Sequence, residues 1–171
     1  NAKNLEDINF CDILSKFCTD NILKIYKLML FEQKLLFIDE DINRLSSVIG
    51  SFINVLYPID WVNTTIPIMS AQMIRYLQTF LPFINGMSEE LFHYNGKVVL
   101  REAEEGVFQI YLKDGIIKYS KQNNEDEVLS SIPNLPKKIY NKLYQEISDL
   151  QKIVALLKDE QKESLSNNIN N

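Results

Sequence analysis

A run of four apolar residues, Leu35-Leu36-Phe37-Ile38, constrains the fold of this 171-residue chain more than any other feature. The run is too short for a helix and is apolar at every position, so it predicts a central strand that is buried on both faces. The acidic residues Asp39, Glu40 and Asp41 end this strand. A strand buried on both faces needs a layer of helices on each side of its sheet.

Amphipathic helices are predicted before and after this strand. Residues 12–31 indicate one or two helices, and Thr19 and Asp20 are the expected cap, because their side-chain oxygens can accept from free amides of the first turn. After the strand, Asp41 is the expected cap of a second helix. Both helices carry an apolar stripe with helical spacing. The stripes are Ile22, Ile25, Tyr26, Met29 and Leu30 in the first helix, and Leu45, Val48, Ile49, Phe52, Ile53 and Leu56 in the second.

A proline corner follows the second helix. Pro58 ends that helix, because the residue before a proline is pushed out of the α region. We expect Trp61 to fill the core between helix and strand, since its ring buries a large area. Direct contact with a partner is the alternative for Trp61, because tryptophan is enriched in binding hot spots. Thr64 to Ile68 then predicts a strand, with Pro67 at its end or at a bulge.

The middle of the chain predicts short elements. Ser70 is the expected cap of a helix that runs to about Thr79. The apolar segment from Phe80 to Gly86 is expected to be extended and closed by a turn. A short helix over residues 88–92 and a short strand over residues 97–100 complete this region.

The last third predicts a hairpin and a long helix. Asp114-Gly115 lies between the apolar runs 107–112 and 116–119, and Asp-Gly favours a hairpin turn that needs positive φ. Residues 121–127 indicate a polar surface loop. After two prolines, a long helix carries an apolar stripe that needs a partner. Its residues are Ile139, Leu143, Ile147, Leu150, Ile153, Val154 and Leu157.

These elements predict an α/β fold: a three-layer sandwich with a central mixed sheet and helices on both faces. The sheet is expected to use residues 35–38, 64–68, 107–112 and 116–119. The order of these strands does not follow from the sequence.

Charge and motifs exclude several classes of function. A formal charge of −5 without a cluster of Lys and Arg argues against nucleic-acid binding. No apolar run approaches the ~18 residues that a bilayer span needs. The five glycines are scattered, so no phosphate-binding loop is expected. Cys11 and Cys18 are expected to be buried or half-buried thiols. No second Cys or His lies two to four residues from either of them, as a structural zinc site commonly requires, and His93 is the one histidine of the chain. We therefore expect no cofactor, no metal and no catalytic residue.

The order of elements between Leu35 and Gly86 resembles the central module of the DENN domain. The resemblance rests on the strand, the amphipathic helix, the Tyr57-Pro58-Ile59-Asp60-Trp61 corner, the Ile66-Pro67 segment and the Pro82-to-Gly86 segment. Weaker matches downstream extend it over residues 17–150. The chain departs from the family after the strand, where Asp39 stands in place of a frequent Ser, and after Trp61, where Val62-Asn63 replaces Gln-His.

The resemblance implies an exchange factor for Rab-family GTPases that has no chemical active site. In this family the GTPase contacts two lobes, so it also implies an upstream longin-like lobe and a downstream DENN segment as partners within the parent protein. The alternative is a DENN-like scaffold or complex subunit without exchange activity. Loops on a rigid scaffold commonly carry binding residues. The expected partner-binding residues are Asp39, Asp41, Asp60, Trp61 and Asn63.

The expected domain organisation has three parts. Residues 1–10 form a flank whose Asn1-Ala2 start is consistent with a cloning scar. Residues 11–157 form the module, and residues 158–171 form a polar tail that is expected to be disordered. The module is expected to be cytoplasmic and to meet vesicle membranes only through the GTPase.

Overall fold

A mixed five-stranded sheet forms the centre of the molecule. The computed structural model describes residues 11, 13–121 and 124–169. The strand order is β2-β3-β1-β4-β5. Strand β1 lies in the middle and is parallel to β3 and β4, β2 is parallel to β3, and β5 is antiparallel to β4. The strands are β1 (Leu35–Asp39), β2 (Thr64–Ile66), β3 (Phe83–Ser88), β4 (Phe108–Tyr111) and β5 (Ile116–Tyr119).

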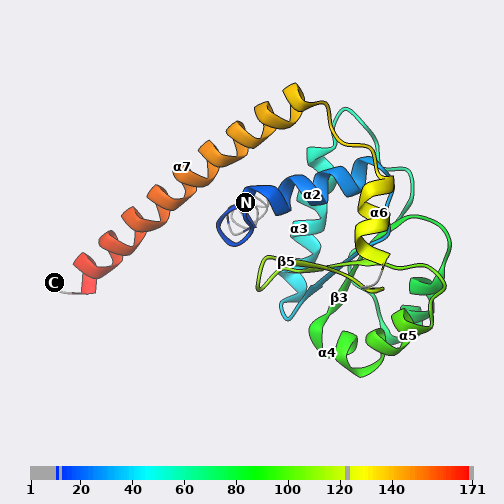
Figure 1. Cartoon of the computed structure of the whole chain (residues 1–171). Coiled ribbons are helices and arrows are strands. Elements are labelled where there is room, and N and C mark those ends of the chain that lie inside the picture. The colour runs from blue at the N-terminus through cyan, green and yellow to red at the C-terminus, as the bar shows by residue number, and fades with distance from the viewer. Residues whose placement is uncertain (1–10, 12, 122–123, 170–171) are drawn as a thin grey trace.

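Helices cover both faces of this sheet, so the predicted three-layer sandwich is confirmed. Figure 1 shows α2 and α3 on one side and α4 and α5 on the other. The helical elements are α2 (Thr19–Leu30), α3 (Ile42–Val55), the 3-10 helix η1 (Ala71–Gln78), α4 (Glu89–Leu91), the π-helical turn η2 (Phe92–Gly96), α5 (Lys97–Glu102), α6 (Glu125–Ser131) and α7 (Lys137–Ile169).

The central strand divides the core into two apolar clusters. Leu35 and Phe37 pack with the buried stripes of α2 and α3, whereas Leu36 and Ile38 pack with buried residues of η1 and α5. Successive side chains of a strand point to opposite faces, so an uninterrupted apolar run supplies both clusters. The prediction that this strand is buried on both faces is confirmed.

Strand β3 is the strand of the sheet that the sequence did not predict. Gly86 was expected to close the segment in a turn, but it lies inside the strand. A Cβ atom at Gly86 would be 2.0 Å from the carbonyl oxygen of Pro67 and 2.8 Å from Cδ1 of Ile49. Beside it, Asn85 Oδ1 accepts a hydrogen bond of 3.1 Å from the backbone N–H of Ile66. Asn85 and Gly86 therefore allow neighbouring segments of the chain to lie close against β3.

Several helix boundaries also differ from the predictions. Residues 97–100 belong to α5 and not to a strand, because Leu100 packs into the core while Val98 is exposed. The N-cap of α2 is Cys18, which is exposed and makes no side-chain capping hydrogen bond. The expected caps, Thr19 and Asp20, instead bond to α7.

Two further predictions of loops and caps need correction. Helix α6 begins at Glu125, within the predicted loop 121–127. Ser70 occupies the N-cap position of η1 but makes no capping hydrogen bond. Two other predictions are confirmed, because Asp41 caps α3 and Gly115 adopts a φ of 66° in the β4–β5 turn.

Helix α7 packs across α2 through part of its stripe. Val154 is buried, and Gln151 Nε2 donates to the backbone oxygens of Leu14 and Phe17 at 2.8 and 2.7 Å. Other apolar residues of the helix remain 46–65% exposed: Ile139, Leu150, Ile153, Leu156 and Leu157. The backbone is helical to Ile169, and Figure 1 shows α7 reaching beyond the sheet. The division into domains stays a prediction.

Within the described residues, the helices are all too short or too polar to cross a bilayer.

Candidate functional site

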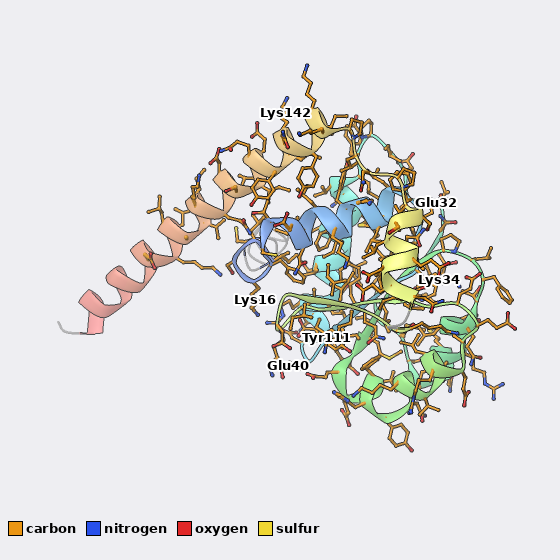
Figure 2. All side chains as sticks on the ribbon, viewed as in Figure 1. Lys16, Glu32, Lys34, Glu40, Tyr111 and Lys142 are labelled. Atoms are coloured by element: carbon orange, nitrogen blue, oxygen red, sulfur yellow. The ribbon has the colours of Figure 1, made fainter. Side chains whose placement is uncertain are left out.

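Helix α3 separates the five predicted binding residues into two groups. Asp39 and Asp41 lie at the carboxyl end of β1, where α3 begins, whereas Asp60, Trp61 and Asn63 follow the end of α3. The second group directly precedes the parallel strand β2, so it lies at the opposite edge of the sheet. Figure 2 shows the two ends of β1 well apart, with Glu40 at one end and Lys34 at the other. The structure therefore does not bring the five residues together.

The first group stabilises the corner between β1 and α3. The carboxylate of Asp39 is buried and accepts from Arg44 Nε at 2.7 Å and from the backbone N–H of Asp41 at 3.0 Å. Asp41 Oδ1 in turn accepts from the backbone N–H of Asn43 at 2.9 Å. A partner cannot contact the Asp39 carboxylate unless Arg44 moves. The partner-binding role of Asp39 stays a prediction, and its geometry is that of a structural ion pair.

The second group lies in the loop of residues 57–63. Asp60 is exposed, and Asn63 Nδ2 donates to Glu32 Oε1 at 3.0 Å, which ties this loop to the turn before β1. Trp61 is half-buried and packs against the α2–α3 core, so its predicted core role is confirmed. Its buried indole Nε1 has no hydrogen-bond partner among the described residues.

Exposed apolar side chains lie in this loop and in the segment before β3. The parallel register pairs Thr64 with Phe83, so the residues before β2 and those before β3 share one edge of the sheet. Their exposed fractions are large: Tyr57 85%, Ile59 55%, Val62 80%, Phe80 66% and Leu81 65%. We call these five residues, together with Asp60 and Asn63, the amino-edge surface. Sequence reasoning missed the five apolar members, although each lies within four residues of a loop proline, Pro58 or Pro82.

Two pockets border the amino-edge surface. One, of about 280 Å³, is lined by Trp61, Ile59 and the end of α2, and the other, of about 390 Å³, lies beside Phe80. Glu32 lines both pockets. The ammonium of Lys34 lies 6.0 Å from the centre of the Phe80 ring and pairs with Glu105, which fixes this side of the surface.

The amino-edge surface suits docking of a protein more than chemistry on a small molecule. Aromatic and aliphatic groups with a polar rim are typical of protein interfaces. In the described part of the chain, no three His, Cys, Asp or Glu side chains gather as they would around a metal ion. Pocket and rim together can bury a partner's apolar side chain and hydrogen-bond its backbone.

Comparison with known proteins finds one matching family model and several relatives that carry its name. The model of the DENN (AEX-3) domain matches residues 1–111, which is more than half of the chain. The chain is 26% identical over 135 residues to mouse DENN domain-containing protein 3, covering 79% of this chain and 10% of that protein. It is 27% identical over 148 residues to human DENN domain-containing protein 2D, covering 86% of this chain and 30% of that protein.

A third relative matches nearly the whole chain. Human DENN domain-containing protein 2B is 22% identical over 166 residues, which is 97% of this chain and 14% of that protein. The chain thus spans less than a third of the length of each of these three relatives.

Proposed function

The chain belongs to the DENN domain family, and from this membership we propose that it is the central module of an exchange factor for a Rab-family GTPase. An exchange factor needs no catalytic residue, because it speeds nucleotide release by binding the nucleotide-free GTPase more tightly than the nucleotide-bound form. Its working part is a shaped surface.

In addition to the family membership, one observation supports this proposal: the amino-edge surface exposes large apolar side chains. Tyr57 and Val62 are each at least 80% exposed, although both are large apolar residues. Exposed aromatic residues such as Tyr57 are enriched at binding hot spots. Asp60 and Asn63 at its rim supply polar contacts to the GTPase.

The proposed partners follow from the family. The GTPase contacts this module together with an upstream longin-like lobe, and a downstream DENN segment completes the parent protein. The module works in the cytoplasm and reaches vesicle membranes through the GTPase. These roles concern the whole parent protein, of which the chain is one part.

Release of a fluorescent guanine nucleotide from a panel of Rab GTPases tests the proposal. The parent-length protein is expected to accelerate release from at least one Rab, and the 171-residue chain alone is expected to be insufficient. No acceleration by the parent on any Rab would contradict exchange activity. Rab binding without acceleration would favour the alternative, a DENN-like scaffold.

A charge reversal tests the position of the surface. Asp60→Lys in the parent protein is expected to slow exchange, whereas Glu102→Lys, at the exposed end of α5, serves as the control. Unchanged exchange in the Asp60 variant would remove this loop from the interface without touching the activity itself.

A further inference from the structure

A lysine-lined hollow lies beside the β4–β5 hairpin and shares Tyr119 and Lys121 with the 390 Å³ pocket beside Phe80. Its volume is about 530 Å³, and three lysines from two segments line it: Lys97 of α5, and Lys118 and Lys121 from β5 and the residues directly after it. The neutral polar residues Gln109 and Ser120 also line the hollow. The described lining residues include no Asp or Glu.

Aromatic rings position two of these lysines. Gln109 and Lys118 are partners in the antiparallel register, so their side chains and that of Tyr111 share one face of the hairpin. The Lys118 ammonium lies 5.1 Å from the Tyr111 ring centre, and the Lys97 ammonium lies 5.8 Å from that of Phe92. The two rings pack edge to face at 6.1 Å. The lysines are thus held against one aromatic pair.

These cations lack acidic partners. Within the described residues, neither Lys97 nor Lys118 forms a salt bridge, and Lys121 Nζ donates to the backbone oxygen of Glu104 at 2.6 Å. Glu89 lies near enough to contribute to the raised pKa of Tyr111, after the larger effect of burial, but it does not line the hollow. In a chain of net charge −5, such a local excess of positive charge attracts anions.

Neutral donors also face the same space. Tyr111 donates its hydroxyl to Gln109 Oε1 at 2.8 Å, which leaves the Gln109 amide N–H groups as donors. Ser120 Oγ accepts from the backbone N–H of Val107 at 2.8 Å, so its own proton is free to donate elsewhere. The hollow therefore combines three cations with uncharged donors.

We infer that this hollow binds a terminal phosphate group, one that is esterified at most once, carried either by a lipid headgroup or by a soluble phosphorylated compound. A phosphate presents several acceptor oxygens and up to two charges, which suits lysine ammonium groups that approach from different segments. The ligand offsets the mutual repulsion of the three lysines. This inference does not depend on the proposed exchange function, because the hollow and the amino-edge surface involve different residues.

The first experiment titrates the 171-residue chain with inorganic pyrophosphate and follows backbone amide NMR signals. Signals of β4 and β5 are expected to shift in a saturable way. The variant Lys118→Glu is expected to weaken binding by about tenfold or more, since a charged hydrogen bond is worth roughly 1.5–3 kcal/mol. Lys142→Glu is the matched control, because Lys142 is exposed on α7, far from Tyr111 in Figure 2.

Flotation with phosphatidylcholine vesicles separates the two sources of phosphate. Binding that requires added phosphatidylinositol 4-phosphate supports a lipid headgroup, whereas pyrophosphate binding without vesicle binding supports a soluble ligand. Equal binding to vesicles with phosphatidylserine would mean unspecific charge attraction and would overturn the inference. So would shifts that Lys118→Glu leaves unchanged. If Lys118→Glu lowers the melting temperature, Lys97→Ala repeats the test without a charge reversal.

Discussion

The guanidinium of Arg44 donates two hydrogen bonds to the buried carboxylate of Asp39, at 2.7 Å from Nε and 2.5 Å from Nη2. Asp39 ends the central strand and Arg44 lies in the first turns of α3, so this pair fixes the angle at which the helix leaves the sheet. The pair also neutralises a charge that would otherwise stand alone in the core.

Replacing Arg44 by Met is therefore expected to lower the free energy of unfolding by about 3 kcal/mol, because an unpaired buried carboxylate remains. Urea denaturation measures this loss. The double variant Asp39→Asn with Arg44→Met should regain part of it, since no buried charge is left. If the double variant is as unstable as the sum of both single variants, the ion pair does not couple the two residues.

Replacing glycine by alanine is expected to have opposite effects on stability at two positions, Gly86 and Gly50. Gly86→Ala should destabilise the fold by about 2 kcal/mol or more, because the new methyl group collides with the Pro67 carbonyl and overpacked cores are costly. Gly50→Ala in α3 should stabilise by up to about 1 kcal/mol, because nothing lies within 4 Å and alanine favours a helix. Thermal unfolding of both variants decides the matter. Equal shifts would argue against the close packing of β3.

Alanine variants of two exposed tyrosines test whether the amino-edge surface binds the GTPase. Tyr57→Ala should weaken Rab binding by the parent protein by about 2 kcal/mol, as expected of an aromatic hot spot. Tyr94→Ala in η2 is the control, because Tyr94 is 78% exposed but belongs to another part of the molecule. Equilibrium binding to the nucleotide-free GTPase is the measurement. Similar losses in both variants would contradict a localised interface.

Alkaline pH should weaken the fold through Tyr119. Burial raises the pKa of Tyr119 above its ordinary value of 10.0; a backbone hydrogen bond with Gly106 opposes this shift in part, and the charges of Glu105 and Glu125 add to it. The folded state therefore holds this proton more tightly than the unfolded state. Its contribution to stability is complete below pH 10.0 and is lost as the pH rises through the folded pKa.

Unfolding measured from neutral pH to above pH 10 checks this expectation. Tyr119→Phe keeps the ring that packs 4.7 Å from that of Phe108 and should flatten the alkaline decline. An identical decline in the Phe variant would assign the effect to other groups.

The sequence predicted the layers of the fold because burial leaves a direct mark on residue patterns. The four-residue run at Leu35 indicates a strand that is buried on both faces, and the stripe of α3 indicates a helix that is buried on one face. Strand β3 escaped prediction because Asn85-Gly86 is a turn signal in isolation, and only the crossing of Pro67 and α3 over Gly86 shows why glycine stands there.

The candidate site was predicted less well than the fold. Asp60 in the predicted binding loop is exposed, but Asp39 was grouped with this loop although α3 lies between them. Strand direction decides which loops share an edge, and direction depends on contacts far apart in sequence. The exposed apolar residues Tyr57 and Val62 leave no periodic signal, since exposure in a loop is set by tertiary packing.

The position of β1 between two parallel partners also has a kinetic consequence. Strand β1 begins at Leu35, but its neighbours begin only at Phe83 and Phe108, so the central pairing must close long loops. Among the described strands, only β4 and β5 pair through a short turn. We expect this hairpin to form early and β1 to dock late, so its apolar residues Leu35 to Ile38 stay exposed, and prone to aggregation, until the strand docks.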